Sequence, residues 1–108
     1  GKIYVKDIAQ KTDAYQLSKA ILLNDNAEFN SKPELEIYAD DVKCSHGSTS
    51  GNVEEESLYY LMTRGLSRKE SLRLLINGFL NDIVDVIKSN TIKNFISSNL
   101  EKQIYEYK

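Results

Sequence analysis

The segment PELEIYADDVKCSHGSTSG, residues 33–51, decides the fold of this 108-residue chain. Apolar and polar residues alternate in its first half, so that Leu35, Ile37 and Ala39 share one face of an extended segment. This period of two predicts a β-strand. Asp40-Asp41 then favours a turn through side-chain to backbone hydrogen bonds, and a second short apolar run follows.

The residues upstream show the same organisation, with short apolar runs separated by clusters of turn-forming residues. We expect strands of about four to seven residues in these runs, at 3–5, 17–23, 27–29, 35–39 and 42–44. No Asn-Gly or Asp-Gly pair marks a tight hairpin in this half of the chain. The pattern therefore leaves open whether the strands pair antiparallel or stack in parallel coils. No internal repeat of about 20–50 residues is evident by inspection.

Beyond residue 52 the hydrophobic period becomes that of a helix. Asn52 and Glu55 have the spacing of a capping box, which would begin a first helix, and Gly65 stands where a left-handed residue would end it. Ser67 and Glu70 repeat the capping-box spacing and predict the start of a longer helix.

The longer helix carries an apolar stripe, from Leu72 to Ile87, at the three- and four-residue spacing of a buried face. Asn77-Gly78 is a point at which this helix could bend or break, because glycine costs about 1 kcal/mol relative to alanine inside a helix. A last helix is expected from about Thr91. Strands followed by helices, rather than alternating with them, predict an α+β fold divided near residue 52.

The composition excludes several classes of function. The chain has 14 Lys and Arg against 16 Asp and Glu, a formal net charge of −2, whereas nucleic-acid-binding modules carry a basic excess. No segment approaches the ~20 apolar residues of a membrane span, and no apolar leader is present at the amino terminus. A single Cys excludes an internal disulfide framework, so we expect a reducing compartment, the bacterial cytoplasm or its equivalent.

The one Cys and the one His limit the possible chemistry, because Cys44 and His46 are only two residues apart. If this segment is a strand, both side chains project from the same face, where a thiolate and an imidazole can ligate a metal or form a nucleophile–base pair. Together they supply at most half of a tetrahedral site. The structural alternative is a buried Cys beside a hydrogen-bonded His at the end of the sheet.

Other candidate motifs in the segment are weaker. The glycine- and hydroxyl-rich residues 46–51 lack the lysine of a P-loop and are interpreted as a connection from strand to helix. Asp40, Asp41, His46 and Ser48 include the residue types of a hydrolytic triad, but no Gly-x-Ser-x-Gly elbow is present. A small metal-dependent hydrolase that uses Cys44, His46 and an Asp remains a third possibility.

Residues 33–51 resemble the SufD branch of the SufB/SufD family of iron–sulfur cluster assembly scaffolds. The similarity extends upstream through residues 9–16 and downstream through 54–67 and 72–79, so that it covers about residues 1–80. Gly47 favours the SufD branch, because the SufB branch tends to have an acidic residue after the histidine. The resemblance implies that residues 1–51 are the last coils of a right-handed parallel β-helix. Residues 52–108 would then be the carboxy-terminal helical domain of a longer protein.

The resemblance also implies a function. Members of the family are not free-standing enzymes: SufB and SufD form a heterodimer, and each docks a SufC ATPase through its carboxy-terminal region. ATP hydrolysis is thought to rearrange the SufB–SufD interface, where a nascent cluster is assembled from iron and persulfide sulfur. The interface histidine of the family falls on His46, and Cys44 belongs to the same motif.

The same resemblance places SufC docking in the region from the end of the strands through the first two helices, with Tyr59, Tyr60, Arg64 and Gly65 as candidate contacts. Iron or a nascent cluster is expected only in the full assembly, with no cofactor in this chain alone. Unpaired backbone in the β region would favour self-association, so a homodimer is also expected to be possible. The alternative is an interaction module with no role in metal handling.

Overall fold

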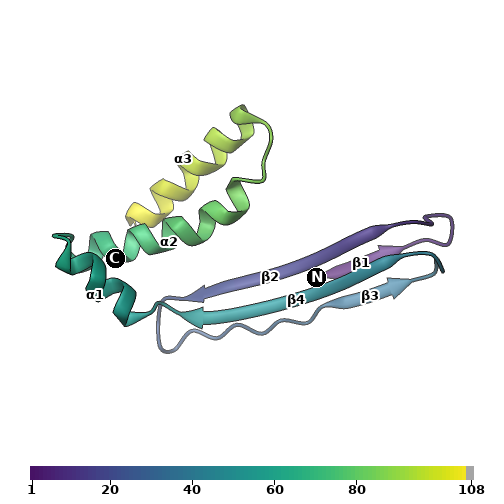
Figure 1. Cartoon of the computed structure of the whole chain (residues 1–108), viewed down its shortest axis with the longest axis horizontal. Helices are drawn as coiled ribbons and strands as arrows, with labels where there is room; N and C mark the ends of the chain where they lie inside the picture. Colours follow the sequence, from purple (N-terminus) through teal and green to yellow (C-terminus); the bar gives the residue numbers. More distant parts are fainter. Residues whose placement is uncertain (107–108) are drawn as a thin grey trace. The chain divides into compact units, whose positions relative to one another are not determined.

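The computed structural model describes residues 1–106, which form an α+β fold of parallel strands followed by helices (Figure 1). The strands are β1 (Lys2–Val5), β2 (Asp13–Leu22), β3 (Glu34–Ile37) and β4 (Lys43–Asn52). The helices are α1 (Glu55–Thr63), α2 (Arg68–Val84) and α3 (Asn90–Glu106). The chain divides into two compact units, one from Gly1 to Asn52 and one that begins at Val53. Residues 107–108 of the expected helical domain lie outside the described residues.

The first unit consists of two pairs of parallel strands, β1 with β3 and β2 with β4. Within this unit β1 and β3 run in one direction and β2 and β4 in the opposite direction (Figure 1). Lys2 lies opposite Glu34, 32 residues later, and Asp13 lies opposite Lys43, 30 residues later. The second half of the unit therefore repeats the path of the first. The sequence does not reveal this repeat because few of the paired residues are identical.

Three expectations for the strands were wrong. Residues 46–51 are part of β4 and not a connection, β2 begins at Asp13 and not at Leu17, and residues 27–29 form no strand. The cause is pairing between distant segments. β4 is in register with β2 along its whole length, from Lys43 to Asn52, and backbone pairing of this kind outweighs the weak strand propensity of Ser and Gly.

The corners of the two repeats are joined by backbone hydrogen bonds. The Lys11 N–H donates to the Asp41 carbonyl at 2.6 Å, and the Lys43 N–H donates to the Thr12 carbonyl at 2.8 Å. The Asp41 N–H donates in turn to the side-chain oxygen of Gln10 at 3.0 Å. Lys11 adopts a φ of 63°, which is unfavourable for a residue with a Cβ. These bonds hold the two corners together and fix where β2 and β4 start.

α1 begins differently from the prediction. Its N-cap is Glu54, which makes no side-chain capping bond, whereas Asn52 is the last residue of β4 and lies opposite Leu22. Because α1 begins at Glu55, Asn52 lies two residues before the N-cap position and does not cap the helix. The predicted end is confirmed, because Gly65 follows α1 with a φ of 97°, a conformation that glycine adopts without the steric cost of a Cβ.

α2 begins as predicted, with a capping box between Ser67 and Glu70. The Glu70 N–H donates to Ser67 Oγ at 3.2 Å, and the Ser67 N–H donates to Glu70 Oε2 at 2.8 Å. The Ser67 hydroxyl also donates to this carboxylate at 2.6 Å, and its hydrogen bond lowers the pKa of Glu70. The helix continues through Gly78 without a break and ends at Val84.

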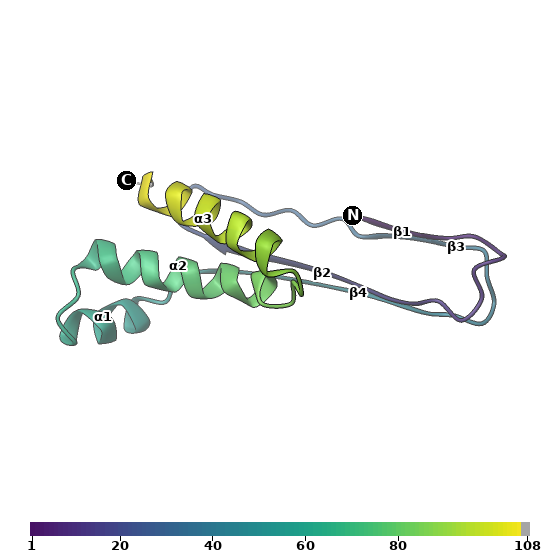
Figure 2. The same ribbon diagram turned by 90° about the horizontal axis from the view of Figure 1, so that it is seen from above.

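The second unit buries little apolar surface. α2 and α3 lie side by side and antiparallel, and α1 packs against α2 (Figure 2). The buried apolar residues of this unit are Leu58, Ile76, Val84 and Ile104. The predicted apolar stripe is only partly buried, because Ile83 is exposed and Val86 lies beyond the end of α2, also exposed. α3 begins at Asn90, within one residue of the expected position.

Substitution of the α2 N-cap tests this account of the helix. Ser67→Ala should lower the free energy of unfolding by about 1 kcal/mol, because it removes the acceptor for the Glu70 N–H. Chemical denaturation measures the change. The lowered pKa of Glu70 means that its stabilising contribution is present above about pH 4.3 and is lost as the pH falls through the lowered value. The stability of the Ser67→Ala variant should therefore depend less on pH in this acid range than that of the wild type.

Ser71, one turn further along α2, provides the control. It is completely buried, and among residues 1–106 its hydroxyl has no hydrogen-bond partner, so Ser71→Ala should leave stability unchanged or raise it. Equal destabilisation by the two substitutions would contradict the capping argument.

Candidate functional site

Cys44 and His46 both lie on β4, where they alternate onto the same face of the strand. Cys44 lies opposite Ala14 of β2 and is half-buried, whereas His46 lies opposite Gln16 and is exposed. Within residues 1–106 the His46 side chain has no hydrogen bond to another group. Its exposure does not fit the alternative in which His46 is a satisfied core residue. The imidazole is available to a ligand or a partner.

Within residues 1–106 the pair does not form a complete metal site. Among the described residues, no group of three or more His, Cys, Asp and Glu side chains lies close enough to hold a metal ion. The metal-dependent hydrolase considered above therefore lacks a third ligand in the part of the chain that the structure describes. Further ligands for a metal at His46 would have to come from another molecule.

β4 also presents an unpaired edge. One edge of this ten-residue strand pairs with β2, and within residues 1–106 no strand pairs with the other. Its sequence, KCSHGSTSGN, has no proline and a single charged residue, Lys43. Proteins usually protect exposed strand edges with prolines, charges or bulges. An edge without these features is suited to the addition of a strand from another molecule, and His46 lies near its middle.

The candidate docking residues lie at the carboxyl end of α1. The Arg64 guanidinium lies 5.1 Å from the centre of the Tyr60 ring, and its Nη2 donates to the Tyr60 hydroxyl at 3.3 Å. Tyr60 is 57% exposed and Tyr59 is more exposed still. Gly65 ends the helix beside them. The structure therefore joins Tyr60 and Arg64 into one exposed aromatic and cationic feature.

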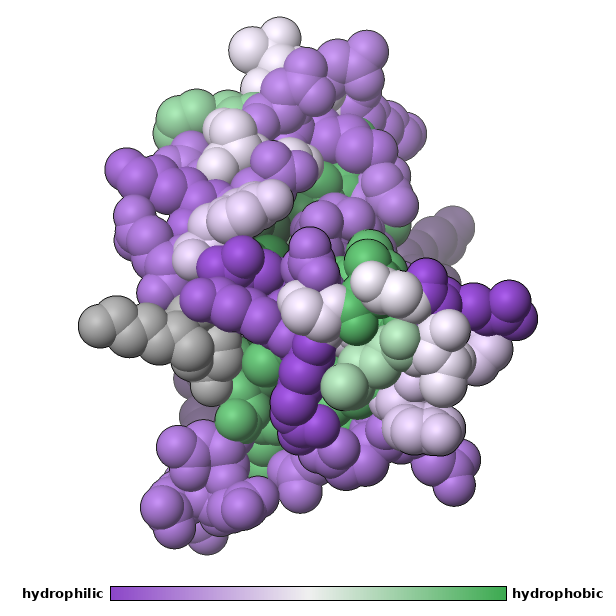
Figure 3. Space-filling view, turned by 90° about the vertical axis from the view of Figure 1, so that its left-hand side faces the viewer, coloured by the Kyte–Doolittle hydropathy of each residue, from purple (hydrophilic) through white to green (hydrophobic). Residues whose placement is uncertain are grey.

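A hollow of about 400 Å³ lies between α1 and α2 beside this feature. Its lining combines acidic and apolar side chains: Glu54, Glu56, Ser57, Tyr60, Leu61, Leu74 and Leu75. On the face shown in Figure 3, exposed hydrophobic residues lie among hydrophilic ones. Tyr and Arg are enriched at protein interfaces, where acidic residues are usually at the rim. The surface is therefore suited to protein binding.

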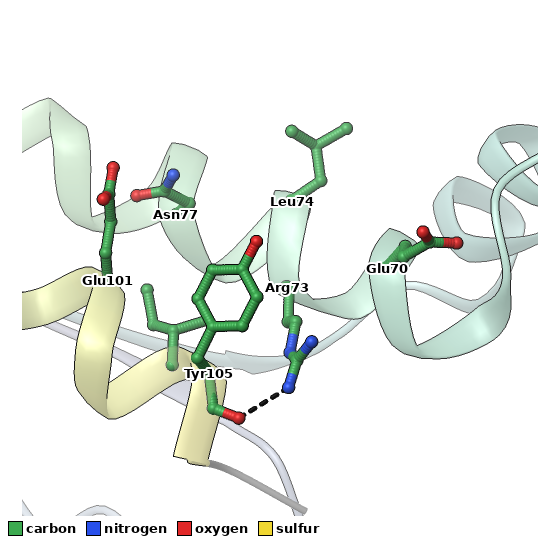
Figure 4. Close-up of a pocket in the computed structure, with 7 residues that line it drawn as sticks. Glu70, Arg73, Leu74, Asn77, Glu101 and Tyr105 are labelled. Carbon is green, nitrogen blue, oxygen red and sulfur yellow. Dashed lines mark hydrogen bonds between the residues drawn. The ribbon is translucent and has the colours of Figure 1, made fainter.

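A second hollow, of about 290 Å³, lies between α2 and α3 (Figure 4). Arg73 crosses it: its Nη2 donates to the Tyr105 carbonyl at 2.5 Å, and its guanidinium lies 4.5 Å from the centre of the Tyr105 ring. Carbonyl groups in the last turn of a helix lack intrahelical partners. Arg73 supplies such a partner and holds the end of α3 against α2, which is a structural role that the sequence pattern did not indicate.

None of the helices in residues 1–106 is long and apolar enough to cross a membrane.

Comparison with known proteins identifies relatives of the chain. Residues 1–79 match the family model described as "SUF system FeS cluster assembly, SufBD core domain". An "Iron-sulfur cluster assembly SufBD family protein" of Synechocystis sp. is 45% identical over 87 residues, which are 81% of this chain and 19% of the relative. "Iron-sulfur cluster assembly protein SufD" of Escherichia coli is 34% identical over 104 residues, 96% of this chain and 25% of the relative.

The protein of the same name from Bacillus subtilis is 35% identical over 96 residues, 89% of this chain and 22% of the relative. The chain thus spans about a fifth to a quarter of the length of these relatives. The family model ends within α2, so the rest of α2 and all of α3 lie outside it.

Proposed function

Because the chain belongs to the SufBD family of iron–sulfur cluster assembly proteins, we propose that it is the carboxy-terminal part of a SufD-type scaffold subunit. In this role it pairs with a SufB-type subunit through β4 and docks a SufC-type ATPase through α1 and α2. The observation that carries the proposal is the position of His46, exposed on a long strand whose outer edge is unpaired among the described residues.

The strands of the first unit are, in this proposal, the last two coils of a right-handed parallel β-helix. Each coil consists of a short strand, a corner and a long strand running back. The parallel register supports this interpretation, because equivalent residues of the two halves lie opposite each other at separations of 32 and 30 residues. Corner bonds such as that from Lys11 to Asp41 support it further, since they stack one turn of chain on the next.

Pairing with the SufB-type subunit follows from the backbone chemistry of β4. Its unpaired N–H and C=O groups can be satisfied by a strand of the partner, which adds hydrogen bonds without any change in the chain. Such pairing brings His46 to the boundary between the subunits. A neutral imidazole is a good ligand for iron, and thiolates from the partner would complete a site for iron as cargo or for the nascent cluster. Cys44, half-buried on the same face, is a weaker candidate for a second ligand.

Docking of the SufC-type ATPase is assigned to the feature formed by Tyr60 and Arg64 and to the adjoining hollow between α1 and α2. Exposed Tyr and Arg side chains frequently contribute most to the binding energy of an interface. Tyr59 and Gly65 lie beside them. ATP hydrolysis then takes place on the partner, so the chain contributes binding surfaces and not a catalytic centre. The proposed location is the bacterial cytoplasm or an equivalent reducing compartment.

A second candidate function is an interaction module with no role in metal handling. The two functions differ only in what His46 does once the subunits have paired.

Replacement of the histidine separates the two functions. In the intact protein, His46→Ala should leave the complex with the SufB- and SufC-type subunits assembled, because the side chain is exposed, but should abolish most cluster formation. Size-exclusion chromatography measures assembly, and iron and sulfide analysis of the purified complex measures the cluster. Ser48→Ala is the matched control, since Ser48 is exposed on the same face of β4. A normal cluster yield from His46→Ala would remove the histidine from the proposal.

Replacement of Tyr60 tests the docking surface. Tyr60→Ala should weaken binding of the SufC-type ATPase about tenfold, because it removes a large exposed side chain and the partner of Arg64. Tyr105→Ala is the control, since Tyr105 is similarly exposed but lies on α3. Calorimetric titration of each variant with the ATPase gives the affinities. Unchanged affinity for Tyr60→Ala, or an equal loss for both variants, would argue against docking at this end of α1.

A further inference from the structure

Tyr15 of β2 lies across Gly47 of β4. In the register of the sheet, Tyr15 is opposite Ser45 and Leu17 is opposite Gly47, all on the face away from His46. A methyl group added at Gly47 would lie 2.6 Å from the Tyr15 hydroxyl oxygen and 3.6 Å from the carbon that carries it. The phenol end of Tyr15 therefore occupies the space that a side chain at position 47 would fill.

Gly47 differs in this respect from the other glycine of β4, Gly51. Gly51 lies on the same face of β4, and a methyl group added there would meet no atom within 4 Å. Tyr15 is nevertheless 63% exposed, and within residues 1–106 its hydroxyl has no hydrogen-bond partner. The ring thus lies over a glycine while its polar end remains available to another molecule.

The hydroxyl also lies where a neighbouring strand could reach it. Side chains opposite each other on adjacent strands have Cβ atoms about 4.5–5.5 Å apart. Because the Tyr15 hydroxyl takes the place of a Gly47 side chain, a residue opposite Gly47 on a strand added to the free edge of β4 would be its direct neighbour. Leu17, 52% exposed beside it, supplies apolar surface that such a strand would cover.

We propose that Tyr15 supplies the side chain that position 47 lacks, and that its hydroxyl hydrogen-bonds a polar side chain on the strand of the SufB-type partner. The inference rests on the proposed pairing at β4 and adds to it a residue that determines partner specificity. A hydroxyl enclosed by an interface needs a hydrogen-bond partner to offset its desolvation. The partner strand therefore carries a hydrogen-bonding residue, and not an aliphatic one, opposite Gly47.

A structural role for Tyr15 makes a different prediction. An aromatic ring over a glycine can stabilise a sheet by covering its backbone. In that case only the ring matters, and loss of the hydroxyl leaves partner binding unchanged. Tyr15→Phe separates the two roles, because it keeps the ring and removes the hydroxyl.

The test measures the dissociation constant of the intact protein and the purified SufB-type subunit by calorimetric titration. Tyr15→Phe should raise the dissociation constant about two- to tenfold, the effect of one hydrogen bond. Gly47→Ala should raise it similarly, because its methyl group displaces the hydroxyl. In the Gly47→Ala background, Tyr15→Phe should have no additional effect. In the Gly51→Ala background, it should have its full effect. Thermal unfolding of each variant confirms that the fold is retained.

The outcomes distinguish the inference from the function on which it rests. The inference is supported if Tyr15→Phe lowers the affinity in the wild-type and Gly51→Ala backgrounds but not in the Gly47→Ala background. If the wild-type protein binds the SufB-type subunit and Tyr15→Phe binds it equally well, the inference about Tyr15 is overturned but the proposed pairing stands. Failure of the wild-type protein to bind the SufB-type subunit at all would overturn the proposed pairing, and the role of Tyr15 with it.

Discussion

The parallel pairing of β2 with β4 is the interaction on which the first unit depends. It runs without interruption from Asp13 opposite Lys43 to Leu22 opposite Asn52. Backbone N–H and C=O groups are obligatory hydrogen-bonding groups, so pairing one edge of β4 gives a Ser- and Gly-rich segment a regular extended conformation. The same pairing leaves the second edge of β4 without a partner in residues 1–106. Fold and binding surface thus arise from one constraint.

This constraint also positions the side chains of the candidate site. The period of two in a strand places Cys44 and His46 on one face and Gly47 on the other, while the register brings Tyr15 close enough to cross Gly47. The paired strands β2 and β4 therefore offer a partner three kinds of group: free backbone amides and carbonyls of β4, the exposed imidazole of His46 and the hydroxyl of Tyr15. The helices contribute a separate exposed feature, because the Arg64 guanidinium lies over the Tyr60 ring at the carboxyl end of α1.

Local sequence signals predicted the local features well. The capping box of Ser67 and Glu70 and the left-handed Gly65 depend on residues close in sequence, and both are confirmed. Signals that depend on distant residues were weaker: nothing in residues 46–51 indicates a strand until β2 is placed beside them. Asn52 was assigned to a helix cap for the same reason. His46 and Cys44 could be singled out by their scarcity, whereas Tyr15 could not, because its contact with Gly47 exists only in the paired sheet.

The central claim is that the free edge of β4 is completed by a strand of a SufB-type subunit. Amide hydrogen exchange, resolved by residue with and without this subunit, tests it most directly. Successive amides along a strand point to alternate sides, so those that face β2 should be protected in the protein alone. Addition of the subunit should then protect the remaining amides between Lys43 and Asn52, every second residue. Unchanged exchange at these amides, in a complex that has formed, would contradict the account.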